Sequence, residues 1–188
     1  MIAAVLLAAG ESNRFGGQKL LETWRGQPLI ARAAGSLLGA GLRPLVVVVP
    51  PAKAFSEALK GQELVLIENH QPERGIGHSI ALGIGGLPAG VAAALLAVAD
   101  QPLMDEPLIK ALCAAYVPGA IVAPRYGTHQ GNPRIFDRLF FAELLRLDGD
   151  RGGQTVASAH RGQVIECSFP EEAGLDIDRP SDFQRLPG

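Results

Sequence analysis

Two cations near the N-terminus stand beside a small, glycine-rich segment where they could bind phosphate. Arg14 and Lys19 follow an apolar run over residues 2–7, whose length and β-branched content are typical of a buried strand. Mostly small side chains follow at the end of that run, and they leave the backbone open to a ligand. The predicted nucleotide-binding residues there are Leu7, Ala8, Ala9 and Gly10. Backbone N–H groups combined with two cations suit a phosphate chain, so this segment is predicted to bind one.

The segment differs from two familiar phosphate-binding loops. A Walker A loop has glycine four residues before its lysine and a hydroxyl residue after it, whereas Phe15 precedes Lys19 by four and Leu20 follows it. A dinucleotide-binding loop has a second glycine two residues after the first, where this chain has Ser12 after Gly10. An ordinary strand-to-helix turn with two surface cations is the alternative interpretation.

Asp100 is the predicted metal ligand. It follows an apolar run over residues 93–98, and a carboxylate at the end of a buried strand is well placed to hold Mg²⁺. This cation takes one or two carboxylates together with phosphate oxygens and water. Capping of the next helix is the alternative role, but Asp105 lies closer to that helix and suits capping better.

A second carboxylate near the C-terminus is predicted to share the metal. Asp176 and Asp178 alternate around Ile177, so an extended backbone points both carboxylates to one side. Asp178 is the predicted ligand, whereas Asp176 is balanced between the metal and solvent. In the competing interpretation Ser181 caps a last helix and both aspartates are solvated.

Ser79 is a candidate nucleoside contact. Gly75 and Gly77 precede it, and a helix that begins there would present N–H groups and the serine hydroxyl to a ligand. Capping of that helix by His78 or by Ser79 itself is the competing interpretation.

Alternating elements are predicted to position these residues. Strand-like apolar runs occupy residues 2–7, 44–49, 64–67, 93–98 and 120–122, and helical patterns occupy residues 28–38, 52–59, 77–85 and 106–116. This alternation predicts one α/β domain over residues 1–188, a Rossmann-like three-layer sandwich with a mostly parallel sheet. Ligands bind such sheets at the carboxyl ends of the strands, where the segments after residues 7 and 98 converge.

Composition narrows the class of protein. The net charge is −2 with both signs interspersed, which argues against a nucleic-acid partner. Cys113 and Cys167 lie far apart, outside any Cys-x-x-Cys motif, so neither a disulfide framework nor a zinc site is expected. There is no basic n-region at the start and no apolar run of membrane-spanning length. We therefore expect a cytoplasmic protein without a membrane segment.

Several segments together resemble one enzyme family. Residues 7–21 follow the pattern Leu-Ala-Ala-Gly-x-Ser-x-Arg-Phe-Gly-x-x-Lys-Leu-Leu, and residues 100–103 read Asp-Gln-Pro-Leu. Residues 127–136, 147–153 and 176–183 add the segments Gly-Asn-Pro, Gly-Asp and Asp-Ile-Asp. The set is similar to nucleotidyltransferases that join an NTP to a phosphorylated acceptor, in particular the molybdenum cofactor cytidylyltransferases.

The resemblance implies a fold, a reaction and a set of partners. The fold would be the nucleotide-diphospho-sugar transferase type, and the reaction would transfer CMP from CTP to the phosphate of molybdopterin with release of pyrophosphate. Mg²⁺ would be the cofactor, held by Asp100 and Asp178, with Arg14 and Lys19 as catalytic cations. Ser79 would face the base or ribose. A molybdoenzyme or its chaperone would receive the product.

Two further segments would form the acceptor pocket by the same resemblance, with Asn132, Pro133 and Asp150 as acceptor-binding residues. The chain departs from the family pattern at two positions. Ala99 replaces a glycine beside Asp100, and Gln154 stands where the family usually has arginine. The missing guanidinium removes a bidentate phosphate donor, which bears on the identity of the acceptor.

Three other functions compete with this one. A guanylyltransferase, or a relative acting on another phosphorylated acceptor, would use the same residues. A serine hydrolase is the second, because residues 77–81 nearly match a nucleophile elbow, with Asp150 and His160 following in order. The third is a non-catalytic module that binds a nucleotide or the pterin.

Overall fold

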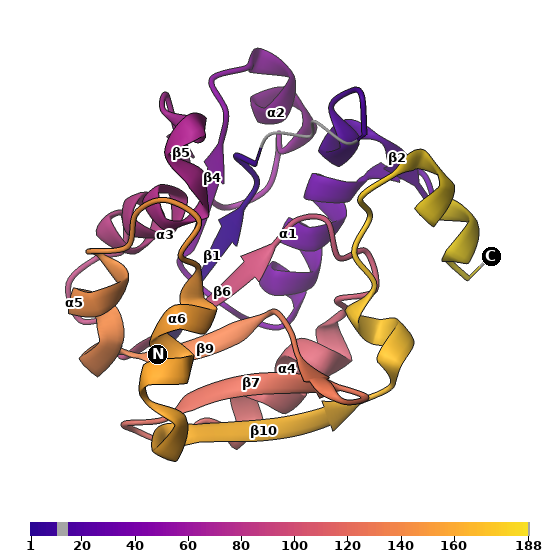
Figure 1. Cartoon of the computed structure of the whole chain (residues 1–188). Helices are drawn as coiled ribbons and strands as arrows, with labels where there is room; N and C mark the ends of the chain where they lie inside the picture. Colours follow the sequence, from indigo (N-terminus) through magenta and orange to yellow (C-terminus); the bar gives the residue numbers. More distant parts are fainter. Residues whose placement is uncertain (11–14, 188) are drawn as a thin grey trace.

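A twisted β-sheet runs through the centre of the molecule (Figure 1). The protein is described by a computed structural model over residues 1–10 and 15–187. Within that range the sheet has eight strands in the order β10-β7-β9-β6-β1-β4-β5, with β8 paired to β7. The strands are β1 (Ile2–Leu7), β4 (Leu45–Val49), β5 (Val65–Glu68), β6 (Ala93–Val98), β7 (Ile121–Tyr126), β8 (His129–Gln130), β9 (Arg134–Asp137) and β10 (Val164–Phe169).

Most strand pairs are parallel, as predicted. Strand β1 pairs in parallel with β4 and with β6. Strand β4 also pairs in parallel with β5, and β7 pairs in parallel with β10. The exception at the centre is β9, which is antiparallel to both β6 and β7. A separate hairpin joins β2 (Thr23–Trp24) to β3 (Gln27–Pro28).

Helices cover both faces of the sheet, which gives the predicted three layers (Figure 1). Helices α1 (Leu29–Gly39), α2 (Lys53–Ala58) and α4 (Glu106–Ala115) contribute to the core on one face. Helices α3 (Gly75–Gly85), α5 (Phe141–Leu144) and α6 (Gly153–Ala159) contribute to the core on the other. Short 3₁₀ segments occupy Lys19–Leu21, Pro72–Arg74, Arg138–Phe140, Arg161–Gln163, Glu171–Gly174 and Pro180–Arg185.

Alternation along the central strands explains the two cores. In β1, Ala4 and Leu6 belong to one core, whereas Val5 and Leu7 belong to the other. Because successive side chains of a strand point to opposite faces, a strand buried on both faces needs a continuous apolar sequence. That requirement accounts for the uninterrupted apolar runs of β1, β4 and β6.

The predicted elements are present, and the structure adds others. Strands β1 and β6 have their predicted bounds, whereas β7 extends to Tyr126. Strands β9 and β10 and helices α5 and α6 were not predicted. Asp105 caps α4, as expected, by accepting from the Leu108 N–H at 3.0 Å. No helix in the described ranges is long and apolar enough to cross a membrane.

Candidate active site

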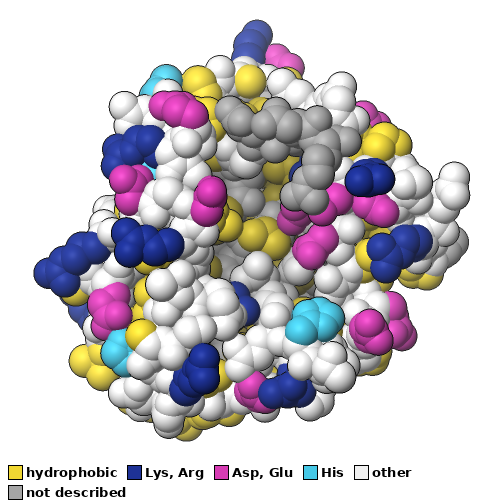
Figure 2. Space-filling view, viewed as in Figure 1, with side chains coloured by type: hydrophobic (Ala, Val, Ile, Leu, Met, Phe, Trp, Pro, Cys, Tyr) yellow, Lys and Arg dark blue, Asp and Glu magenta, His cyan; other side chains and the backbone are white. Residues whose placement is uncertain are grey.

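A cavity of about 440 Å³ opens at the carboxyl ends of β1 and β6. Figure 2 shows this face of the molecule hollowed near its centre, with hydrophobic side chains deep in the hollow. We call this space the first cavity. Nine residues predicted to bind nucleotide, metal or acceptor line it: Leu7, Ala8, Ala9, Gly10, Lys19, Ser79, Asp100, Asp150 and Asp178.

The end of β1 forms part of the cavity wall. Leu7, Ala8 and Ala9 are buried and Gly10 is exposed. The Ala8 N–H donates to the Val48 carbonyl at 2.8 Å, so this amide belongs to the sheet and is not available to a phosphate. The predicted catalytic Arg14 lies outside the described residues.

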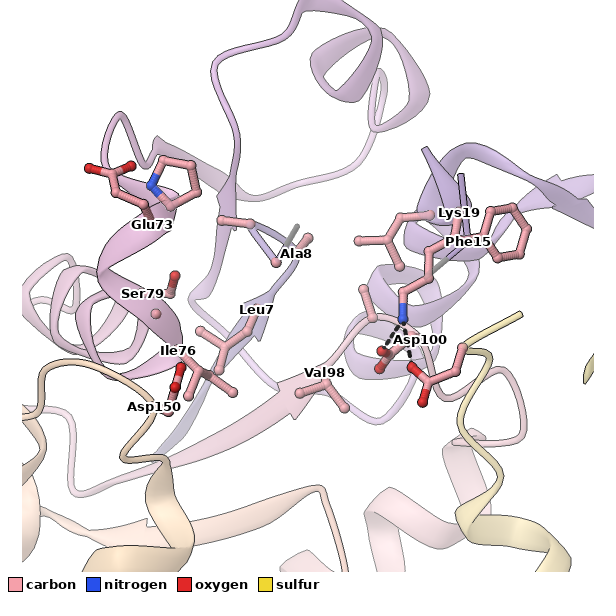
Figure 3. Close-up of a pocket in the computed structure, with 17 residues that line it drawn as sticks. Leu7, Ala8, Phe15, Lys19, Glu73, Ile76, Ser79, Val98, Asp100 and Asp150 are labelled. Atoms are coloured by element: carbon pink, nitrogen blue, oxygen red, sulfur yellow. Dashed lines mark hydrogen bonds and ion pairs between the residues drawn. The ribbon is translucent and has the colours of Figure 1, made fainter. Parts of the chain in front are cut away.

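Lys19 lies among acidic groups on one side of the cavity (Figure 3). Its Nζ is 2.7 Å from Asp100 Oδ2 and 3.6 Å from Asp178 Oδ1, and it donates to the Ile177 carbonyl at 2.8 Å. The ammonium therefore joins the end of β6 to a C-terminal segment far away in sequence. The two carboxylates predicted as metal ligands converge on one point.

This carboxylate pair fits the needs of Mg²⁺. The ion binds through one or two carboxylates and completes its shell with water and substrate phosphates. Asp100 and Asp178 both reach the point that the Lys19 ammonium occupies, so a divalent cation there would replace or displace that ammonium. The donor set is oxygen only, which suits a hard cation.

Asp176 lies beside this pair and contacts Gln101. Its Oδ1 accepts from Gln101 Nε2 at 2.9 Å, and it lines neighbouring cavities together with Asp178 or Gln101. Asp176 is exposed, but its carboxyl group is partly desolvated. This loss of hydration and the charges of Asp100 and Asp178 raise the pKa of Asp176 to about 6, while the hydrogen bond from Gln101 acts in the opposite direction. Loss of hydration is the larger cause of this rise in the pKa of Asp176, and the two nearby carboxylates add to it.

Ser79 lies on the opposite side of the cavity, together with Ile76, Glu73 and Asp150 (Figure 3). Helix α3 begins at Gly75, two residues earlier than predicted, so Ser79 lies inside the helix and does not cap it. Its Oγ accepts from the Nδ2 of buried Asn69 at 3.0 Å. A hydroxyl that accepts in this way keeps its own proton to donate to a ligand.

The start of α3 packs closely on the loop that carries Asp150. The Gly77 N–H donates to the Gly149 carbonyl at 2.9 Å, so it is not free for a nucleoside. A Cβ added at Gly77 would come within 2.6 Å of the Asp148 nitrogen and 2.9 Å of the Arg151 oxygen. Glycine is needed here because two backbones meet. Asp150, predicted to bind the acceptor, is thereby placed across the first cavity from Lys19.

A second cavity, of about 790 Å³, lies over β7, β8 and α6. Asn132 and Arg134 line it together with Gln154. Pro133, between Asn132 and Arg134 in the sequence, is buried, and the peptide bond between Asn132 and Pro133 is cis. The residues predicted for the acceptor are therefore divided, with Asn132 at the second cavity and Asp150 at the first.

A third space, of about 110 Å³, lies between the two cavities and shares lining residues with each. It shares Leu7, Ile76 and Val98 with the first cavity. With the second cavity it shares Asn132, Arg134 and Gln154. Two ligands bound in the two cavities would therefore meet near the ends of β1 and β6.

The geometry does not support a serine hydrolase. A nucleophile elbow places its serine on a sharp turn between strand and helix, beside a histidine. Ser79 lies within α3 and its hydroxyl contacts Asn69. His160 instead contacts Glu143 at 2.8 Å.

Comparison with known proteins assigns the chain to a family. Residues 4–164 match the MobA-like NTP transferase domain. The chain belongs to this family. The nicotine blue oxidoreductase of Paenarthrobacter nicotinovorans is 30% identical to this chain over 203 residues, covering 98% of this chain and 96% of that protein. A probable molybdenum cofactor guanylyltransferase of Deinococcus radiodurans is 27% identical, covering 100% of this chain and 94% of its own length.

Solved structures superpose on nearly the whole of this MobA-like chain. Rv0371c from Mycobacterium tuberculosis superposes with a TM-score of 0.84 at 29% identity, covering 98% of this chain and 95% of the other. A second Rv0371c structure, a complex with manganese, superposes with a TM-score of 0.80 at 26% identity, covering 98% and 97%. The predicted nucleotidyltransferase fold is thus confirmed.

Three site residues were missed by sequence reasoning. Asn69 directly follows β5, and its position at the carboxyl edge of the sheet was a signal that could have found it. Gln101 is part of the Asp-Gln-Pro segment next to Asp100. Arg134 carried no such signal, because its burial depends on β9 inserting between β6 and β7.

Proposed function

We propose that this MobA-like protein transfers CMP from CTP to the terminal phosphate of molybdopterin and releases pyrophosphate. The observation that carries the nucleotidyl transfer is the convergence of Lys19, Asp100 and Asp178 on one point of the first cavity. A cation and a carboxylate pair at the carboxyl edge of the sheet are what a metal-bound triphosphate requires.

The proposed reaction is an in-line displacement at phosphorus. An oxygen of the acceptor phosphate attacks the α-phosphorus of CTP, and the bond between that phosphorus and the α,β-bridging oxygen breaks. The bonding electrons leave with pyrophosphate, and the product contains a new diphosphate linkage. A phosphate is already a nucleophile, so the protein needs to position the reactants and offset charge.

Each residue on the charged side has a part in this scheme. Asp100 and Asp178 would hold Mg²⁺, which supplies neutralising charge to the phosphate oxygens when bound. Lys19, released from its carboxylates, would stabilise the charge that develops on the α-phosphate and pyrophosphate. Arg14 is proposed to do the same.

Ser79 is proposed to bind the base or ribose from the opposite side of the cavity. Its hydroxyl is fixed by Asn69 and keeps a proton to donate. Figure 3 shows Ser79 and Lys19 on opposite sides of the cavity, an arrangement that suits a ligand whose phosphates face Lys19 and whose nucleoside faces α3.

The choice of CTP and molybdopterin rests on the motifs around Asp100, Asn132 and Asp150, which resemble the cytidylyl branch. The relative from Deinococcus radiodurans, named a guanylyltransferase, supports GTP as the alternative nucleotide. The product would pass to a molybdoenzyme or its chaperone.

Pyrophosphate release tests the proposal. Purified protein, Mg²⁺ and molybdopterin are combined with each NTP in turn, and CTP is expected to give the fastest release. Faster release with GTP would move the protein to the guanylyl alternative. Because one relative carries an oxidoreductase name, oxidation of NADH and NADPH is followed in parallel. Silence with every NTP would contradict the proposal.

A further inference from the structure

Arg134 is a buried cation without an acidic partner among the residues that the structure describes. It begins β9, where it pairs with Leu96 of β6, and only 5% of its surface is exposed. None of the carboxylates in the described residues forms an ion pair with its guanidinium. Buried charges in proteins are normally paired or bind a ligand, so this position needs an explanation.

Two neutral side chains hold the guanidinium in place. Arg134 Nη1 donates to Asn132 Oδ1 at 3.0 Å, and Nη2 donates to Gln154 Oε1. The buried Nε has no hydrogen-bond partner. A guanidinium carries five N–H donors, and these bonds use two of them. Carboxamide oxygens orient the group but leave its charge uncompensated.

The charge persists at neutral pH. Burial lowers the pKa of Arg134 to about 10, which still leaves the group protonated in the physiological range. Keeping an unpaired guanidinium in this environment costs stability that an apolar residue of the same length would not cost. Such a cost is expected where the charge serves an anionic ligand.

Arg134 also stands where the two cavities meet. It lines both the second cavity and the third space, which lies between it and the first. An anion bound there would lie on the path between the acceptor's side of the molecule and the α-phosphate of a nucleotide.

We propose that Arg134 binds the phosphate of the acceptor and is the residue that selects a phosphorylated acceptor. This inference rests on the proposed nucleotidyl transfer. It also explains a departure in the sequence. Position 154, where an arginine was expected, carries Gln154, and the Arg134 guanidinium reaches its side chain. The positive charge is thus supplied by β9 in place of α6.

The first test measures phosphate binding without turnover. Methyl phosphate, a minimal phosphomonoester, is titrated into wild type, Arg134→Met, Arg134→Lys and Arg138→Met by calorimetry. Arg138 is the matched control, because it directly follows the last residue of β9, at the end away from Arg134, and donates to the Val91 carbonyl at 3.1 Å. We expect Arg134→Met to weaken binding by about tenfold to a hundredfold. Arg134→Lys should be intermediate, and Arg138→Met should stay within twofold.

The second test separates the acceptor from the nucleotide. With molybdopterin and CTP, Arg134→Met should raise the KM for the acceptor by about tenfold or more and leave the KM for CTP within twofold. Thermal unfolding of each variant verifies that it is folded, and Arg134→Met should be at least as stable as wild type. A merely structural Arg134 would instead lower the unfolding temperature and raise both KM values.

The outcomes distinguish the two proposals. Equal binding of methyl phosphate by wild type and Arg134→Met, or no binding by wild type, overturns the role of Arg134. Loss of binding in Arg134→Met alone supports it, even if no NTP gives turnover. Absence of turnover with every NTP contradicts only the nucleotidyl transfer.

Discussion

Lys19 and Arg134 are both cations beside neighbouring cavities, but their partners are opposite in kind. The Lys19 ammonium contacts two carboxylates, at 2.7 and 3.6 Å, so its charge is matched within the protein. The Arg134 guanidinium contacts two neutral carboxamides, and its charge is not matched. Under the proposed function, the first region would exchange one cation for another, and the second would receive an anion.

This difference shows why the number of cations in a site does not by itself reveal what it binds. A neutralised lysine contributes little attraction to a phosphate until its carboxylates take up another cation. An unpaired, desolvated arginine attracts an anion from the start. In the proposed reaction, the metal-bound triphosphate and the acceptor would therefore be attracted to separate but neighbouring cavities.

Substituting Asp100 should have the largest effect. Asp100→Asn removes a proposed metal ligand and the closest partner of Lys19, and we expect kcat to fall by about a thousandfold. The rate of pyrophosphate release at saturating CTP measures this. Glu106→Gln, a partly exposed carboxylate paired with Lys110 at 2.5 Å, is the control and should retain wild-type activity. Full activity in Asp100→Asn would contradict the proposal that the carboxylates beside Lys19 hold a metal, and with it the contrast between Lys19 and Arg134.

Lys19→Met should lower kcat by about a hundredfold, since it removes one stabilising cation from the transition state. The same change leaves Asp100 and Asp178 without their ammonium, so Mn²⁺ should bind the nucleotide-free protein at least as tightly as before. Calorimetry with Mn²⁺ measures this, with Lys110→Met as the surface control. Weaker Mn²⁺ binding in Lys19→Met would show that the lysine and the metal do not share these carboxylates.

Gly77→Ala tests how closely α3 packs on the loop that carries Asp150. Its Cβ would lie 2.6 Å from the Asp148 nitrogen, so we expect the free energy of unfolding to fall by about 1–3 kcal/mol. Gly85→Ala, in the same helix, meets only Leu145 Cδ2 at 3.7 Å and should be stabilising by about 0.5–1 kcal/mol. Urea unfolding compares the pair. Equal effects would mean that the loop at residues 148–151 yields easily.

Ser79→Ala should have the smallest effect. It removes one donor to the nucleoside, so the KM for CTP should rise by about threefold to tenfold, with kcat little changed. Steady-state kinetics measure both. Ser56→Ala, whose exposed hydroxyl donates only to the Lys53 carbonyl at 2.8 Å, serves as the control. An unchanged KM for CTP would show that Ser79 does not contact the nucleotide.

Sequence reasoning succeeded where local pattern determines structure. The runs of β1 and β6 are apolar throughout because both faces of each strand are buried, and their bounds were predicted correctly. The carboxyl-edge rule then indicated where Lys19 and Asp100 would meet. Asp178 was predicted to share a metal with Asp100, but its ion pair with Lys19 was not predicted, because that contact depends on how the C-terminal segment returns to the sheet.

The insertion of β9 between β6 and β7 could not be predicted from local sequence patterns. Strand β9 is short and opens with an arginine, which is typical of a loop, yet it lies between two apolar strands. The burial of Arg134 follows from that insertion and from no local pattern. Asn69 was missed for a different reason, since its role is to orient Ser79 through a single side-chain hydrogen bond.

The most direct test of the central claim follows the α-phosphate of the nucleotide. The protein is incubated with Mg²⁺, molybdopterin and CTP labelled at the α-phosphorus, and the products are separated by chromatography. We predict that the label appears in the modified pterin, one label for each pyrophosphate released, and that Asp100→Asn slows this transfer by about a thousandfold. Label found only in free CMP, or remaining entirely in CTP, would contradict it.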